Sequence, residues 1–302
     1  IWHQGYNNAL QPEGHVLYYQ VFPEMIAAWR QAFGDPQMPF GIISLCTAGE
    51  PQNLGNYLER MIDEGIYIRA VQFQTFLDLS GAGDENIGFA SSYDMRRSWY
   101  HPGLKVPVGE RIARWALATQ YGENIDWRPP MVTDMKTGGG NVTLTFDIPV
   151  AGLRDWPIEG FAIAGADRRF QPAIAEHPVI GENSGKRPSY EHRAVVLSSP
   201  YVPNPVHFRY AWGRNPMGNL IPRSTKSRAP LATQRSDDWR IHEVPVKFGE
   251  QPDRQSLNLA REAHRMFDLR RRLDDAQRLL NEQQENSLQS LEDWNAKWQD
   301  QE

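Results

Sequence analysis

The sequence has little of what several protein classes require. It contains one cysteine, Cys46, so an internal disulfide framework and a zinc site built from several cysteines are both excluded. No apolar run approaches the roughly 18 residues of a membrane-spanning helix, so we expect no membrane span. Basic residues are not in excess, because 32 Lys and Arg stand against 37 Asp and Glu and the net charge is -5. That balance argues against nucleic-acid binding, which usually needs a basic face.

Apolar residues are nonetheless plentiful enough for folded cores. Hydrophobic residues make up 40% of the chain and aromatic residues 11%, which argues against wholesale disorder. A length of 302 residues suits two domains and an extension. The chain opens on Ile1 and Trp2, which read as the end of a buried strand, so we expect the first part of the fold to lie upstream.

Residues 1–126 predict alternating helices and strands. Apolar spacing predicts helices over 14–34, 55–79 and 108–122, and short apolar runs predict strands over 39–46 and 86–94. Gly65 is expected to weaken the middle of the second helix. This alternation implies a parallel sheet with helices on its faces.

Residues 127–248 predict a second domain of another class. Prolines and glycines over 127–140 indicate a boundary. Short alternating runs then predict the strands of an antiparallel β domain, over 141–150, 160–165, 193–199 and 206–213. Residues 177–193 read as a flexible insertion between two of these strands.

Residues 249–302 predict a helical extension without a catalytic role. From about residue 254 charges of both signs alternate without Gly or Pro, and a seven-residue step joins Met266, Leu273 and Leu280. Two interpretations stay open: a long solvated helix that packs on the body, or an arm for self-association.

Two segments contain residue types suited to acyl transfer. In Gln4-Gly5-Tyr6-Asn7-Asn8, the glycine permits close backbone approach to a ligand and an Asn amide can donate to an oxyanion. His101 follows a predicted strand, precedes Pro102 and has Asp94 upstream, as a general base oriented by a carboxylate would. Taken alone, each segment is more typical of a structural feature: the first of a common turn, and His101 of a surface or hydrogen-bonded histidine.

Together and in this order, the segments resemble a known family. Residues 2–9, WHQGYNNA, resemble the "W-Y-Q-G-E-S-N-A" segment of sialate O-acetylesterases, which belong to the SGNH hydrolase superfamily. Residues 101–111 resemble the family's "H-P-x-N-K" and "V-G-x-R" segments, and the similarity continues over 152–175 and 207–220.

The resemblance implies a fold, an activity and roles for five residues. The fold is a partial SGNH-type (flavodoxin-like) α/β/α domain, followed by the antiparallel β domain and the long C-terminal helix. The activity is serine-dependent hydrolysis of acetyl esters on a carbohydrate, without metal or organic cofactor, in a secreted or periplasmic protein. His101 is the base and Asp94 its carboxylate, while Gly5, Asn8 and Gln4 serve the oxyanion and the substrate.

The chain also departs from the family pattern. The nucleophilic serine of the family lies before the Gln-Gly segment, so here it is expected upstream of Ile1, and this chain alone is expected to be inactive. Asp94 lies seven residues before His101 rather than two or three, and Arg96 and Arg97 are alternative partners for it. A Ser-His dyad therefore stays open. So do a catalytically degenerate glycan-binding or scaffold protein and a lipase-like esterase on the same fold.

Overall fold

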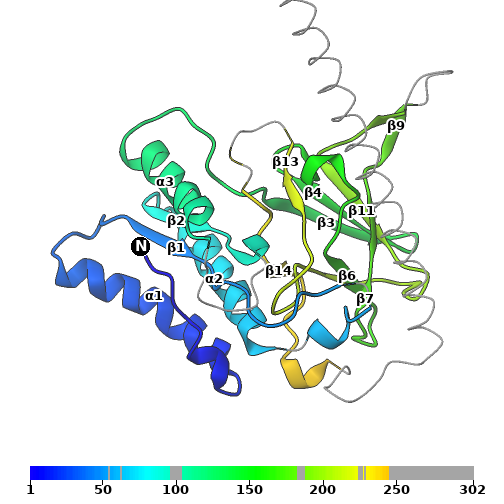
Figure 1. Ribbon diagram of the computed structural model, residues 1–302, viewed down its shortest axis with the longest axis horizontal. Coiled ribbons are helices and arrows are strands. Elements are labelled where there is room, and N and C mark those ends of the chain that lie inside the picture. Colours follow the sequence, from blue (N-terminus) through cyan, green and yellow to red (C-terminus); the bar gives the residue numbers. More distant parts are fainter. Residues whose placement is uncertain are drawn as a thin grey trace, which may run out of the picture.

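The computed structural model describes residues 1–53, 55–61, 63–95, 104–181, 188–223, 227 and 229–244. It shows a mixed α/β protein in which helices and a small parallel sheet lie beside a set of antiparallel sheets (Figure 1). His101 and the extension expected over 249–302 lie outside the described residues, so both stay predictions.

The first part of the chain forms three layers. Strands β1 (Phe40–Ile43) and β2 (Ile87–Ala90) pair in parallel, and Trp2 bridges in parallel to Ile42 on the other edge of β1. Helices α1 (Gly14–Ala32) and α2 (Glu64–Gly81) pack on one face of the sheet, where they share a core with Phe40, Ile42 and Phe89. Helix α3 (Val106–Gln120) covers the other face. This confirms the predicted order of helices and strands.

Two glycines let α3 approach the sheet closely. A Cβ on Gly88 would lie 2.2 Å from the indole of Trp115, and one on Gly41 would lie 2.9 Å from it. Trp115 is buried between these strands and α3. The sheet therefore presents large side chains to α1 and α2 and a flat, glycine-lined face to α3.

The second helix begins later than its apolar spacing predicts. Residues Glu59–Met61 form a short 3-10 turn, η2, and α2 starts at Glu64 with Asp63 as its N-cap, whose carboxylate accepts from Gly65 N–H at 2.8 Å. Gly65 thus lies in the first turn, not in the middle as expected. The side-chain cap sets the boundary because it satisfies one of the free N–H groups at the helix start.

The second part of the chain is a sandwich of two antiparallel sheets. One sheet has the order β3-β4-β11-β8, formed by Val132–Gly138, Asn141–Phe146, Ala194–Ser198 and Ile174–Glu176. The other has the order β14-β12-β6-β7, formed by Gln234–Arg235, His207–Tyr210, Phe161–Ala164 and Gln171–Pro172. Leu144 and Leu197 of the first sheet meet Phe161 and Tyr210 of the second in one core.

Shorter elements complete this part and correct two expectations. Strand β5 (Val150–Gly152) pairs with β13 (Leu220–Pro222), and β9 (Val179–Gly181) pairs with β10 (Ser189–Tyr190) inside the predicted insertion. The predicted boundary over 127–140 contains strand β3, whose side chains are mostly polar and exposed. An edge strand with such a sequence lacks the apolar alternation by which a strand is identified.

The two parts share a buried core. Tyr67 and Ala70 of α2 pack with Ala162 of β6 and with Trp212, which follows β12. Beside them Arg209 and Asp237 form an ion pair of 2.7 Å whose side chains are 2% and 0% exposed. The guanidinium lies 4.2 Å from the ring centre of Phe170 and 4.5 Å from that of Trp212. The division expected at residue 126 stays a prediction, and the contact across it is extensive.

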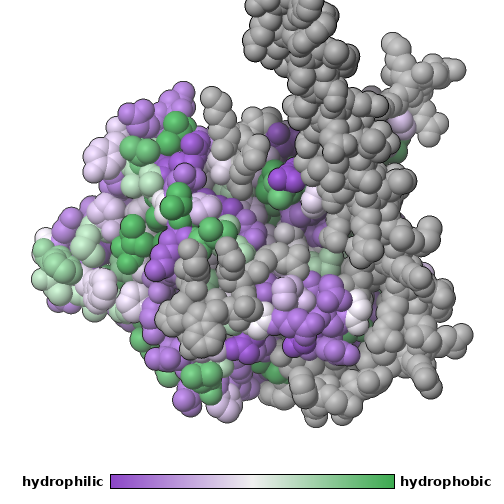
Figure 2. Space-filling view, in the orientation of Figure 1, coloured by the Kyte–Doolittle hydropathy of each residue, from purple (hydrophilic) through white to green (hydrophobic). Residues whose placement is uncertain are grey.

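Helix α1 exposes an apolar stripe on its far side. Leu17, Val21 and Trp29, four and eight residues apart, are 57%, 52% and 40% exposed, and Phe33 beyond the helix is 73% exposed. In the space-filling view, apolar residues are scattered among polar ones over the side where Figure 1 places α1 (Figure 2). This stripe is apolar surface that the described residues leave uncovered.

Candidate active site

Four of the predicted site residues, Gln4, Gly5, Asn8 and Asp94, lie where the parallel strands end, whereas His101 lies outside the described residues. The carboxyl ends of Trp2, β1 and β2 lie at one edge of the sheet, because the strands run in the same direction. We call this the carboxyl edge and define it as residues 3–8, 44–47 and 91–94. In open α/β sheets this edge is where ligands bind.

Gly5 lies in a tight, buried turn on this edge. Its φ of +143° is one that residues with a side chain rarely adopt, and a Cβ would lie 2.9 Å from Ile68 and 3.2 Å from Gln72. The Gln4 carbonyl accepts from the hydroxyl of Tyr18 at 3.1 Å and from the amide of Gln72 at 2.8 Å. The side chain of Gln4 is exposed. The turn is thus held by α1 and α2 through its backbone.

Two donors suited to an oxyanion have no hydrogen-bond partner among the described residues of the chain. Asn8 begins the 3-10 turn η1 (Asn8–Leu10), and its N–H donates to the Gly5 carbonyl at 3.1 Å. Among the described residues, neither the Gly5 N–H nor the Asn8 side-chain amide has a hydrogen-bond partner. A donor of this kind can stabilise a developing oxyanion if a ligand reaches it.

Asp94 makes a bidentate ion pair with Arg111. It lies in the 3-10 turn η3 (Tyr93–Met95) after β2, and its two oxygens accept from Arg111 of α3 at 2.7 and 2.6 Å. Arg111 also donates to the Ser91 carbonyl at 2.7 Å. The sequence had pointed to Arg96 or Arg97, which lie outside the described residues. Both Asp94 oxygens already have a cationic partner, so a role toward His101 stays a prediction.

Lys105, four residues after His101, lies near the opening turn. Leu104 and Lys105 are the first described residues after His101, and they directly precede α3. Removal of water around the imidazole lowers the pKa of His3, although the residue is exposed overall, and the Lys105 charge lowers that pKa further. The electrostatic contact between Lys105 and His3 shows that the two motif segments lie near each other.

The described serines of the carboxyl edge have structural partners. Ser92 donates its hydroxyl to the Ser44 carbonyl at 2.7 Å, and its N–H donates to the Ser44 hydroxyl at 3.2 Å. Ser91 is buried beside them. In the described part of the chain none of these hydroxyls has a histidine partner, and none follows the strand-to-helix turn of a serine nucleophile.

The β sandwich contributes Arg214 to this edge. The Arg214 guanidinium hydrogen-bonds the Tyr6 hydroxyl and lies 3.7 Å from an oxygen of Asp63. Arg69 of α2 fixes the loop that contains Arg214, because it donates to the carbonyls of Gly213 and Arg214. Arg69 is 1% exposed, and burial lowers its pKa to about 10. Neither arginine was predicted from the sequence, because a helical position does not reveal contacts with residues about 145 positions away.

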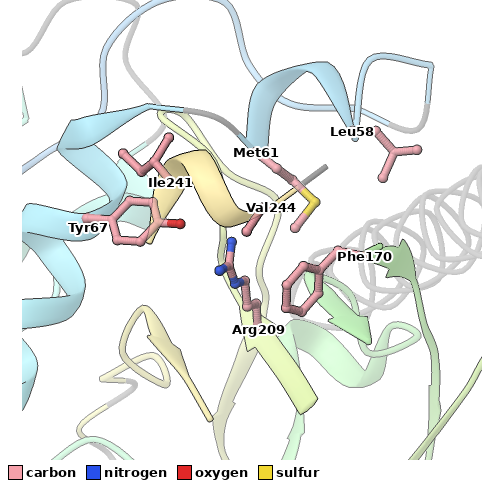
Figure 3. A pocket seen from close by; sticks show the side chains of 7 residues that line it. All are labelled: Leu58, Met61, Tyr67, Phe170, Arg209, Ile241 and Val244. Atoms are coloured by element: carbon pink, nitrogen blue, oxygen red, sulfur yellow. The ribbon is translucent and has the colours of Figure 1, made fainter. Parts of the chain in front are cut away.

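A hollow elsewhere contains none of the predicted residues. It lies between η2, α2 and β12, where Arg209 points between Tyr67 and Phe170 (Figure 3). Its other lining residues are apolar: Leu58, Met61, Ile241 and Val244. It has room for about one water molecule, and its arginine is already paired with Asp237. It is a packing gap and not a sugar site.

The described ranges contain neither a metal cluster nor a membrane helix. No group of three or more His, Cys, Asp or Glu side chains there has the arrangement of a metal site. No helix among the same residues has the length and apolarity to cross a membrane.

The structure is similar to that of a carbohydrate acetylesterase. No protein-family model matches the sequence, and no curated protein matches it either. Among solved structures, that of a novel carbohydrate acetylesterase from Xanthomonas citri matches with 30% sequence identity and a TM-score of 0.64. The match covers 79% of this chain and 50% of that one, so this chain spans about half the length of its neighbour. The similarity supports a relationship to esterases.

Proposed function

We propose that the chain is part of a carbohydrate O-acetylesterase of the sialate O-acetylesterase type, on an SGNH-type α/β/α fold. The observation that carries the proposal is the structural similarity to a carbohydrate acetylesterase over 79% of the chain at 30% identity. The Gly5 turn adds support, because two of its donors lack partners among the described residues and lie at the edge of the sheet where ligands bind. The substrate is an O-acetylated carbohydrate.

In this proposal, serine attacks the acetyl carbonyl and His101 takes the serine proton. The tetrahedral oxyanion accepts hydrogen bonds from Gly5 N–H and the Asn8 amide, while Gln4 contacts the sugar. His101 then returns the proton to the sugar oxygen as that leaves, and activates the water that releases acetate. Nothing in this series of steps requires a cofactor.

We place the nucleophilic serine upstream of Ile1. Two observations support this: the described serines of the carboxyl edge have structural partners, and the neighbour is about twice as long as its matched part. The uncovered stripe of Leu17, Val21 and Trp29 is a suitable surface for further chain of the same domain.

We assign Asp94 as the carboxylate that orients His101, with Arg111 holding it in place. The ion pair fixes the carboxylate at the end of β2 and leaves its remaining lone pairs as acceptors. Asp94→Asn keeps the shape and weakens the orientation of the imidazole, so kcat should fall while KM changes little. A Ser-His dyad predicts an unchanged kcat, once Asp94→Asn is shown to be folded.

The test is acetate release from an O-acetylated sialoside. We would compare the protein extended upstream of Ile1, its His101→Ala variant and the present chain. Activity in the extended protein alone, abolished by His101→Ala, supports the proposal. Activity on longer acyl chains equal to that on acetyl would instead indicate a lipase-like esterase.

A degenerate glycan-binding protein or scaffold is the second candidate. It is favoured by Tyr6, since Tyr6 stands where the family has glutamate and its hydroxyl is engaged by Arg214. This candidate predicts no acetate release by the extended protein, together with binding of glycans to it in a calorimetric titration.

A further inference from the structure

The side chain of Gln72 lies between two strand ends of the carboxyl edge. Gln72 belongs to α2 and is fully buried, with 0% exposure. Its Oε1 accepts from the Leu45 N–H at 2.6 Å, and its Nε2 donates to the Gln4 carbonyl at 2.8 Å and to the Tyr18 hydroxyl at 3.0 Å. Every hydrogen of the amide is therefore used.

These hydrogen bonds replace one regular backbone hydrogen bond between β1 and the segment that begins at Trp2. The Trp2 N–H donates to the Gly41 carbonyl and the Trp2 carbonyl accepts from the Ile43 N–H, both at 2.8 Å. One step further, a regular ladder would join the Leu45 N–H directly to the Gln4 carbonyl. Here the Gln72 amide is inserted between those two groups, so the strands separate at that point.

The regular hydrogen bonding between β1 and β2 also ends at this edge through side chains. The Ser44 N–H donates to the Ala90 carbonyl at 2.9 Å, as in a regular ladder. The next rung would join the Ser92 N–H to the Ser44 carbonyl. Instead the Ser92 N–H donates to the Ser44 hydroxyl, and the Ser92 hydroxyl donates to the Ser44 carbonyl. Side chains thus end both ladders at the same edge.

The separation leaves Gly5 without a strand partner. Gly5 directly follows the residue whose carbonyl Gln72 holds, and among the described residues its N–H has no acceptor. We infer that Gln72 is a positioning residue that separates the ends of the Trp2 strand and β1 and so presents the Gly5 N–H to the reacting ester. This inference rests on the proposed function.

The Gln72→Leu substitution removes the inserted amide and puts an apolar side chain of similar size in its place. In the upstream-extended protein, we expect Gln72→Leu to lower kcat by roughly 10- to 100-fold with little change in KM, because an oxyanion donor acts in the transition state. The matched control is Gln74→Leu, the same change at an exposed position of the same helix. A folded Gln72→Leu variant with the kcat of Gln74→Leu overturns the inference.

Glutamate at position 72 gives a readout that loss of stability does not. In the Gln72→Glu variant an ionised carboxylate offers no hydrogen to the Gln4 carbonyl, whereas the protonated acid does. Burial raises the pKa of such a carboxyl group. The kcat of Gln72→Glu relative to the native protein should therefore rise as pH falls from about 8 to about 5, measured where both are folded. A pH-independent ratio overturns the inference.

Amide hydrogen exchange separates this inference from the proposed function. In the native chain we expect slow exchange at Leu45 and fast exchange at Gly5, and Gln72→Leu should accelerate Leu45 while Gln74→Leu does not. If the native protein is inactive but shows this exchange pattern, the esterase proposal is wrong, whereas the structural role of the Gln72 amide is supported. A protected Gly5 N–H in the native chain would overturn the inference whatever the activity.

Discussion

Buried polar side chains connect distant parts of this chain. Gln72 joins α2 to two strand ends, Arg69 joins the same helix to the loop after β12, and Arg209 pairs with Asp237 inside the shared core. None of these roles was visible in the sequence. A polar residue in an amphipathic pattern is assigned to solvent unless its partner is known, and these partners come from other elements.

Breaking the buried ion pair should be costly. Asp237→Ala leaves the Arg209 guanidinium without its carboxylate in a site where it is almost inaccessible to water. We expect the free energy of unfolding to fall by about 3–5 kcal/mol, measured by urea denaturation. Asp238→Ala, the same change at the exposed neighbouring position, is the control and should change it by less than about 0.5 kcal/mol. Equal effects would show that the pair is not the cause.

His192, which follows the β9–β10 hairpin, should make stability depend on pH. Burial lowers the pKa of His192, and the nearby His177 and Arg223 lower it further. The unfolded chain then takes up a proton at a higher pH than the folded chain, so the free energy of unfolding should fall as pH decreases below about 6.5. Urea midpoints between about pH 8 and pH 5 should show a smaller loss for His192→Gln. An identical loss in both would contradict this assignment.

At the scale of elements, close packing between α3 and the sheet depends on glycine. Gly88→Ala places a methyl group 2.2 Å from the Trp115 ring and should lower the free energy of unfolding by about 1–3 kcal/mol. Gly109→Ala, inside α3 with open space around it, should raise that free energy by roughly 0.5–1 kcal/mol. Thermal denaturation of both variants measures these opposite changes in the free energy of unfolding. If Gly109→Ala also lowers it, the loss in Gly88→Ala cannot be assigned to the contact with Trp115.

Most long elements were predictable and most short ones were not. The apolar spacing of α1 and α3 and the short apolar runs of β1 and β2 predict their type and approximate place. The two-residue strands β7 and β14 carry no periodic signal, because pairing with β6 and β12 alone defines them. The candidate site was found by resemblance at Gly5 and Asn8, whereas the Arg111 partner of Asp94 required the packing of α3 beside β2.

At the scale of the whole molecule, the helical extension expected over residues 249–302 is predicted to have no catalytic role. If residues 254–302 form an arm, their removal should leave kcat of the upstream-extended protein unchanged and lower its mass in solution to that of a single chain. Light scattering coupled to size exclusion measures the second effect. A folded truncated protein whose kcat collapses would instead place this segment at the active site.

Helix α2 carries two attachments on neighbouring turns. Arg69 holds the sandwich loop that presents Arg214, and Gln72, three residues later, holds the strand ends that present Gly5. Helix α2 therefore contacts both the sandwich and the carboxyl edge. A rotation of one part would displace the other. We expect a ligand to reach this edge by rearrangement of surface loops and not by a hinge between the two parts, so that strain applied at the sandwich would be transmitted to the Gly5 turn.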